Sequence, residues 1–142
     1  RRRFLEYLPA EANGLYLRMD ATANLAFWSA LRGQSTTPAR LKAALARWRL
    51  DHPLLAARFP VGKFSTGMKR RLALARLELA ATPGWLLDEP VYGLDAEAMA
   101  HFRERLAAHL AAGGLALVVS HDLKPLDGLV SRTLTLGEAR AG

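Results

Sequence analysis

Cysteine is absent from the 142 residues of the chain. The protein therefore forms no disulfide and no thiolate metal site, and an intracellular setting fits this composition. Long apolar runs are also missing. The longest stretch without Asp, Glu, Lys or Arg, residues 106–121, contains two glycines and is shorter than the ~20 apolar residues of a membrane span. The start, residues 1–4, lacks the apolar region of a signal peptide, and we expect it to lie inside a longer protein.

Acidic residues are scarce in the first half of the chain. Residues 1–76 carry 15 Lys and Arg against 4 Asp and Glu, whereas residues 77–142 carry 5 against 9, within a formal net charge of +7. Such a basic half could face nucleic acid, anionic lipid headgroups or a bound triphosphate. A solvated, arginine-rich surface is an equally acceptable explanation, so the charge alone selects no partner.

Four side chains stand where helix N-caps are expected. Their oxygens can accept bonds from the free N–H groups of a first helical turn. The predicted helices are residues 21–31 after Asp20, a second from Pro38 after Thr37, one to about residue 81 after Ser65, and one to about residue 112 after Asp95. Leu41, Leu45 and Trp48 form an apolar stripe on the second of these helices, which indicates a core-facing surface.

Apolar runs bounded by glycine and proline predict the strands. They fall at residues 3–8, 85–87, 115–119 and 133–136. The second run is continuously apolar, which favours a strand covered on both faces, and the third has the same character. Alternation of helix and strand after residue 65 predicts an α/β fold with a mostly parallel sheet and right-handed crossovers.

The organisation that follows has three parts. Residues 1–19 are expected to hold the end of a core strand and the loop after it. Residues 20–64 show only helical patterns and are expected to form a helical lobe. Residues 65–142 are expected to form the α/β core.

Polar side chains follow two of the predicted strands directly. Asp88 and Glu89 come after the strand at 85–87, and His121 follows the strand at 115–119. Ligands of parallel sheets gather outside the carboxyl ends of the strands. One carboxylate there can hold a hydrated Mg²⁺, and the next can polarise a water molecule. Taken alone, the two acids could equally be solvated side chains in a turn.

The helix start at residues 65–67 has the composition of an anion site. The Ser65 hydroxyl and the free N–H groups of the first turn point outward, and Gly67 allows a phosphate to approach the backbone. Ordinary capping explains Ser65 as well, and Gly93–Leu94–Asp95 alone is an ordinary helix entry. A histidine after a strand is usually structural. The specific signal is the order in which these pieces occur.

In that order, the chain resembles an ATP-binding cassette (ABC) ATPase domain over nearly its whole length. Residues 64–68 resemble the family signature, Leu-Ser-Gly-Gly-Gln, with departures at Thr66 and Met68. Residues 85–89 resemble Walker B with its catalytic glutamate, residues 93–95 the D-loop, and His121 the switch histidine. The resemblance implies a P-loop NTPase (RecA-like) fold with an inserted helical lobe.

The resemblance also implies roles for single residues. Glu89 and His121 would be catalytic, and Asp88 would hold Mg²⁺ through water. Ser65, Thr66 and Gly67 would contact the γ-phosphate of ATP bound by the opposite subunit of a head-to-tail dimer, and Asp95 would link the two sites.

Two family features are missing. A phosphate-binding Walker A loop is absent, since residues 62–64 lack the required Ser or Thr after Lys63, and Ala57 replaces its first glycine. We expect the chain to be the C-terminal part of a longer ATPase, and a degenerate domain is the alternative. The family's Q-loop glutamine is also absent, because the single glutamine is Gln34. Glu11 is the candidate to supply that Mg²⁺ ligand.

The resemblance therefore predicts a nucleotide-binding subunit that hydrolyses ATP and drives transport through transmembrane partner subunits, on the cytoplasmic face of the cell membrane. Residues 15–19 resemble those of exporter-type ATPases for haem or drugs. The alternatives are a soluble ABC ATPase acting on nucleic acid or ribosomes, and a non-catalytic regulatory remnant. Nucleic acid is not expected as a partner, since the chain has no coiled-coil heptads, no lysine-rich arm and no second cassette.

Overall fold

A computed structural model describes residues 4–11 and 14–137 of the chain. Its strands are β1 (Leu5–Leu8), β2 (Gly84–Asp88) and β3 (Leu115–Val119). Its α-helices are α1 (Ala21–Leu31), α2 (Pro38–Arg47), α3 (Pro53–Ala57), α4 (Thr66–Ala80) and α5 (Ala96–Ala111). Two 3-10 turns complete the described elements, η1 (Val61–Lys63) and η2 (Lys124–Leu126). The first residue of the predicted strand at 3–8 lies outside the described residues.

The four long helices begin where the sequence predicts, each one residue after a capping side chain. In each case the cap oxygen accepts a hydrogen bond from the backbone N–H three residues further on, which satisfies one free donor of the helix end. These bonds join Asp20 to Ala23 (2.7 Å), Thr37 to Arg40 (3.3 Å), Ser65 to Met68 (3.2 Å) and Asp95 to Ala98 (2.8 Å).

The three strands form one parallel sheet in the order β1-β2-β3. Leu8 pairs with Leu87, and Asp88 pairs with Val119. Because the strands run the same way, the carboxyl ends of β2 and β3 lie at one edge of the sheet. The parallel α/β arrangement predicted from the alternation of elements is confirmed.

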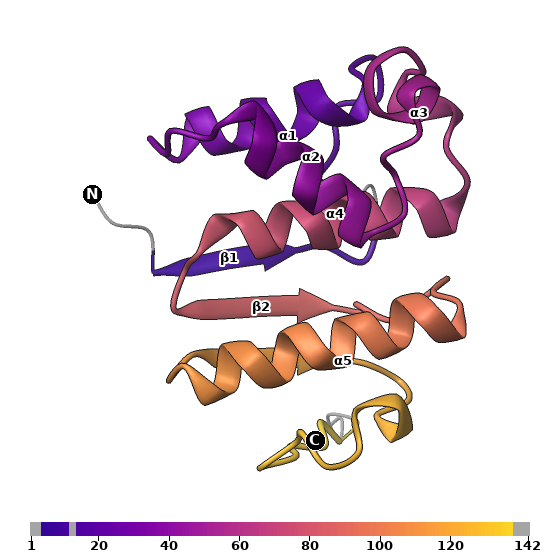
Figure 1. The fold of residues 1–142 in the computed structure, drawn as a ribbon. Helices are drawn as coiled ribbons and strands as arrows, with labels where there is room; N and C mark the ends of the chain where they lie inside the picture. Colours follow the sequence, from indigo (N-terminus) through magenta and orange to yellow (C-terminus); the bar gives the residue numbers. More distant parts are fainter. Residues whose placement is uncertain (1–3, 12–13, 138–142) are drawn as a thin grey trace, which may run out of the picture.

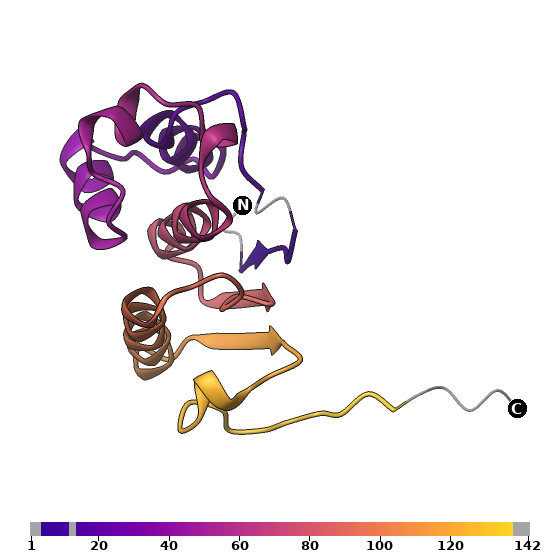
Figure 2. The ribbon, with the colours of Figure 1, turned by 90° about the vertical axis from the view of Figure 1, so that its right-hand side faces the viewer.

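Helices cover one face of this sheet. Helices α4 and α5 lie on the same side of the strands (Figures 1 and 2). Leu8 and Leu87 point to that side and are fully buried, whereas Leu117 of β3 is 60% exposed. Side chains alternate along a strand, so only one set of them meets the helices. In the described structure Leu86 is partly buried, so a cover on the second face of the strand at 85–87 stays a prediction. The 115–119 strand alternates between partly buried and exposed residues.

The predicted last strand is also wrong, because residues 133–136 are not assigned to a strand. After η2 the backbone of Gly128 takes a positive φ of 84°, and the chain runs away from the sheet (Figure 2). Leu134 and Leu136 are exposed. An apolar run becomes a strand only where its N–H and C=O groups find a ladder, and this segment does not reach the free edge of β3.

Helices α1, α2 and α3 pack together above α4 (Figure 1). The predicted stripe of Leu41, Leu45 and Trp48 is buried in the same hydrophobic cluster as Leu72 of α4, which confirms it as core. The indole N–H of Trp48 donates to Glu78 of α4 at 2.9 Å. The domain boundaries at residues 19/20 and 64/65 stay a prediction.

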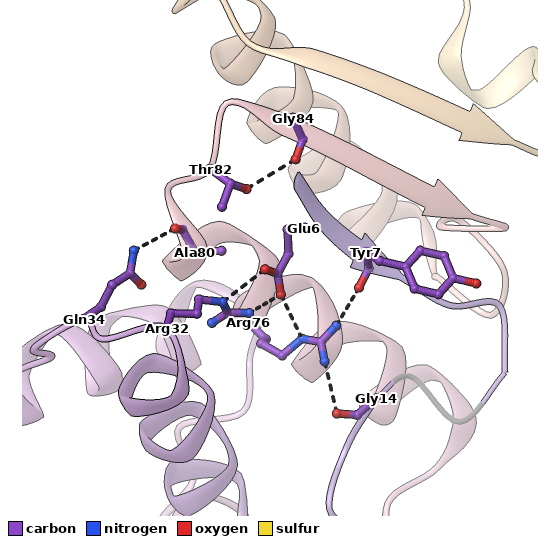
Figure 3. Close-up of polar contacts among 9 residues, drawn as sticks. All are labelled: Glu6, Tyr7, Gly14, Arg32, Gln34, Arg76, Ala80, Thr82 and Gly84. Carbon is purple, nitrogen blue, oxygen red and sulfur yellow. Dashed lines mark hydrogen bonds and ion pairs between the residues drawn. The ribbon is translucent and has the colours of Figure 1, made fainter. Parts of the chain in front are cut away.

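Three charged residues join this helical region to the sheet, and we call Glu6, Arg32 and Arg76 the buried ionic cluster (Figure 3). Glu6 of β1 accepts hydrogen bonds from Arg32 at the end of α1, and Arg76 of α4 lies 4.0 Å from the same carboxylate. Arg76 also donates to the carbonyls of Tyr7 (3.0 Å) and Gly14 (3.1 Å). Burial lowers the pKa of Arg76 to about 10, and Glu6 opposes that shift.

Candidate active site

Four residues with functional side chains meet at the carboxyl edge of the sheet, and we call Asp88, Glu89, Ser120 and His121 the strand-end cluster. Asp88 is the last residue of β2, and Ser120 directly follows β3. The pairing of Asp88 with Val119 brings the two strand ends side by side. The sequence-based expectation that Glu89 and His121 lie together agrees with this geometry.

The last residue of β3 and the turn after it hold Glu89 at three points. The Glu89 N–H donates to the Val119 carbonyl at 2.8 Å. The Ser120 hydroxyl lies 3.0 Å from Glu89 Oε2, and the His121 backbone N–H donates to Glu89 Oε1 at 2.9 Å. Glu89 adopts a φ of +47°, which side-chain-bearing residues rarely take. A residue in such a conformation needs support from its surroundings, and these bonds supply it.

The imidazole of His121 is freely accessible. Its side chain is fully exposed, and its Nε2 lies 3.6 Å from Glu89 Oε1. The Glu89 side chain itself is only 25% exposed. A hydrogen-bonded carboxylate beside a solvent-facing imidazole suits a site in which the histidine touches a ligand that arrives from outside.

The start of α4 lies against the loop that follows Glu89. Ser65 and Thr66 are exposed, and Ser65 caps the helix. A Cβ added to Gly67 would stand 2.8 Å from the Gly93 carbonyl oxygen, so residue 67 must be glycine for this approach. We call residues 65–67 the helix tip; its glycine is fixed in place by the backbone of the residue 89–95 loop.

That loop connects the strand-end cluster to α5. The Tyr92 N–H donates to the Glu89 carbonyl at 3.2 Å, and Gly93 has a φ of +76°. Asp95 ends the loop as the exposed N-cap of α5. Glu89 and Asp95 thus stand at the two ends of a short turn whose middle, at Gly93, contacts the helix tip.

Arg70 of α4 is a site residue that sequence reasoning missed. Its side chain is buried and donates to the carbonyls of Pro9 (3.0 Å) and Ala10 (2.7 Å), in the loop after β1. Burial lowers the pKa of Arg70, and the carboxylates of Asp88 and Glu89 oppose that shift. An arginine on the apolar side of a helix was the available signal, because a buried guanidinium requires partners.

Asp88 and Glu11 are the predicted metal ligands, and they differ in position and in solvent exposure. Asp88 is partly exposed at the sheet edge, whereas Glu11 is exposed in the loop after β1. No group of three or more His, Asp or Glu side chains among the described residues is arranged to hold a metal. One carboxylate suits Mg²⁺ that keeps its waters and binds substrate phosphates, so Asp88 fits and Glu11 stays a prediction.

Known proteins share this arrangement. The chain superposes on a solved ATP-binding subunit of an ABC transporter with a TM-score of 0.72 and 28% identity, over 84% of this chain and 50% of that one. A dimeric ATP-binding cassette in a post-hydrolysis state with ADP and Pi bound gives a TM-score of 0.72 at 20% identity, over 88% and 55% of the two chains. The fold is therefore that of the P-loop ATPase domains of ABC proteins.

Sequence relatives sharpen this class. The chain is 46% identical over 114 residues to the cytochrome c biogenesis ATP-binding export protein CcmA of Cupriavidus necator, covering 80% of this chain and 49% of the relative. It is 42% identical over 132 residues to the CcmA of Ruegeria pomeroyi, covering 92% and 59%. The chain is thus a homologue of the ABC-type ATP-binding proteins named CcmA, and it spans about half their length. No family model matches the chain.

Among residues 4–11 and 14–137, no helix combines the length and apolar character that crossing a membrane requires.

Proposed function

We propose that the chain carries the catalytic half of an ABC-type ATPase that hydrolyses ATP to drive export across a membrane. The observation that carries this proposal is the Glu89 carboxylate, held by Ser120 and His121 at the carboxyl edge of a parallel sheet. In such sheets ligands bind at this edge. The names of the CcmA relatives, which describe ATP-binding export proteins, support the same reading.

The strand-end cluster supplies the groups that phosphoryl transfer needs. Glu89 orients the attacking water and accepts its proton, and His121 contacts the γ-phosphate. Asp88 would hold Mg²⁺ through water, and Glu11 is the candidate for a second oxygen. Bound Mg²⁺ neutralises charge that develops on the phosphate oxygens. The protein contributes mainly position and charge, which matches a carboxylate fixed by several hydrogen bonds.

The helix tip supplies an anion site for a second copy of the protein. Ser65 and Thr66 are exposed, and the first N–H groups of α4 point outward. We infer that Ser65, Thr66 and Gly67 contact the γ-phosphate presented by the partner subunit in a head-to-tail dimer. Asp95, exposed beside the tip through the Gly93 contact, links the two sites.

Some elements that ATP hydrolysis needs are not found in this chain, which spans about half the length of its relatives. We propose that the other half contributes the phosphate-binding Walker A loop and the layer over the exposed face of the sheet. Transmembrane subunits are the proposed partners of the helical region, which places the working complex on the cytoplasmic face of a membrane.

The test compares two proteins for phosphate release from ATP. One is the 142-residue chain, and the other is a complete domain that joins it to the missing half of the Cupriavidus necator relative. We expect turnover only from the complete domain, because the 142-residue sequence has no Walker A pattern to cradle the β-phosphate. Robust hydrolysis by the chain alone, or a folded complete domain that fails to bind ATP, would contradict the proposal. The second outcome would favour a regulatory remnant.

A further inference from the structure

Ser120 is the one member of the strand-end cluster to which the motifs assign no role. It lies between the end of β3 and His121, and its side chain is partly buried. Its Oγ stands 3.0 Å from Oε2 of Glu89. The neighbouring His121 N–H binds the other carboxylate oxygen, Oε1, at 2.9 Å. Each oxygen of the Glu89 carboxylate therefore has its own donor from one short turn.

The Ser120 hydroxyl has a single hydrogen and two acceptors within reach. The Asp122 carbonyl lies 2.9 Å from Oγ, and the Asp122 N–H donates to Oγ at 3.3 Å. We assign the hydrogen to Glu89, because a carboxylate oxygen is a stronger acceptor than a neutral carbonyl. The N–H of Asp122 then holds the Ser120 oxygen from behind and directs its hydrogen toward Glu89.

Two donors, one on each oxygen, fix the orientation of the Glu89 carboxylate, which a single donor cannot do. A carboxylate held at Oε1 alone can still turn about its terminal bond, since that torsion is broad. A second bond at Oε2 stops the rotation and sets the plane of the carboxylate. The backbone cannot replace this support, because Glu89 has a φ of +47° and follows a strand that ends at Asp88.

We infer that Ser120 is a positioning residue that sets the orientation of the Glu89 carboxylate for attack by water. This inference rests on the proposed ATPase function. It predicts that Ser120 affects the chemical step and not ATP binding, because its hydroxyl is directed at Glu89. It also predicts that the effect of removing the hydroxyl passes entirely through Glu89.

The experiment uses the complete domain described above and measures kcat and KM for ATP. Ser120→Ala should lower kcat by about tenfold or more and leave KM within about twofold, as loss of alignment at a reacting group does. Ser120→Thr keeps the hydroxyl and should restore kcat to within about threefold of the unmodified domain. Ser35→Ala, which removes an exposed hydroxyl in the linker between α1 and α2, is the matched control and should change nothing.

A double variant separates positioning from a general structural role. In a Glu89→Gln background, Ser120→Ala should cause no further loss of residual turnover, because both changes disable the same group. Equal kcat for Ser120→Ala and the unmodified domain would overturn the inference while leaving the proposed function intact. An additional loss in the Glu89→Gln background, or failure of Ser120→Thr to recover, would also overturn it. No hydrolysis by the unmodified domain would instead count against the proposed function itself.

Discussion

Two carboxylates near the sheet, Glu6 and Glu89, have opposite surroundings. Glu6 is 5% exposed, and its partners are the guanidinium groups of Arg32 and Arg76. Glu89 is more accessible, and its partners are a hydroxyl, a backbone N–H and a solvent-facing imidazole. The two arginines neutralise the charge of Glu6, so this residue stabilises the fold and is not available to a ligand. Neutral donors hold Glu89 in place while leaving its charge available to a substrate.

The two buried arginines of α4 show the same division. Arg76 belongs to the buried ionic cluster, where it ties β1 to the helical region (Figure 3). Arg70 ties the loop after β1 to the helix that carries the tip, and the charges of Asp88 and Glu89 oppose the lowering of its pKa by burial. Arg76, in the C-terminal half of α4, therefore stabilises the fold. Arg70, nearer the N-terminal end, supports the loop beside the strand-end cluster.

The largest expected effect separates the two carboxylates by activity. Glu89→Gln in the complete domain should lower ATP hydrolysis by about 10²- to 10⁴-fold, because the group that accepts the proton is lost. ATP should still bind and hold the dimer together. Phosphate release and nucleotide binding, measured on the same preparation, check this. Turnover like that of the unmodified domain would show that Glu89 is not the base.

The next largest effect distinguishes Glu6 from Glu89 by the free energy of unfolding. Glu6→Gln should lower the free energy of unfolding by about 3–5 kcal/mol, because two buried guanidinium groups lose their counter-charge. Glu89→Gln should change it by less than about 1 kcal/mol, since its site is partly exposed. Urea unfolding followed by circular dichroism measures both, with exposed Glu104→Gln as the control. An equal loss for Glu6→Gln and Glu104→Gln would remove the distinction between the two carboxylates.

A smaller effect tests the contact between the helix tip and the residue 89–95 loop. Gly67→Ala should destabilise the protein by about 1–3 kcal/mol, because its Cβ meets the Gly93 carbonyl and forces the backbone to shift. Gly137→Ala is the control, as nothing in the described structure lies within 4 Å of its added Cβ. Thermal unfolding of both variants decides the matter. Equal melting temperatures would show that the tip and the loop do not touch.

The smallest effect concerns a third kind of carboxylate, the exposed helix cap. Asp95→Ala should cost about 1 kcal/mol, because the Ala98 N–H loses its acceptor, while Asp95→Asn should be nearly neutral. Urea unfolding can resolve this difference. If Asn destabilised as much as Ala, the charge of Asp95, and not its cap, would be the stabilising feature.

Local chemistry explains why much of the fold could be predicted. The caps at Asp20, Thr37, Ser65 and Asp95 act within three residues, so the sequence contains the whole interaction. The parallel direction of the strands followed from alternation, and the position of Glu89 beside His121 followed from two strand ends. These features depend on neighbours in sequence or on the general geometry of parallel sheets.

The features that sequence reasoning missed depend on distant partners. Glu6 and Arg32 are 26 residues apart, and Arg70 reaches carbonyls about 60 residues away. The apolar side of α4 could have marked Arg70 as a buried guanidinium, but its partners could not be predicted, because backbone carbonyls leave no signature in a sequence. The strand at residues 133–136 was mispredicted because an apolar run shows what could be buried, not what it pairs with.

Mixing two inactive variants of the complete domain tests the central claim most directly. Glu89→Gln removes the base, and Ser65→Asp places a negative charge at the helix tip while keeping a good N-cap. If each site combines Glu89 of one copy with the tip of the other, a mixed dimer contains one intact site. The mixture should then recover about a quarter of the normal rate of ATP hydrolysis, as random head-to-tail pairing predicts. No recovery, with mixed dimers present, would contradict a site shared between two copies.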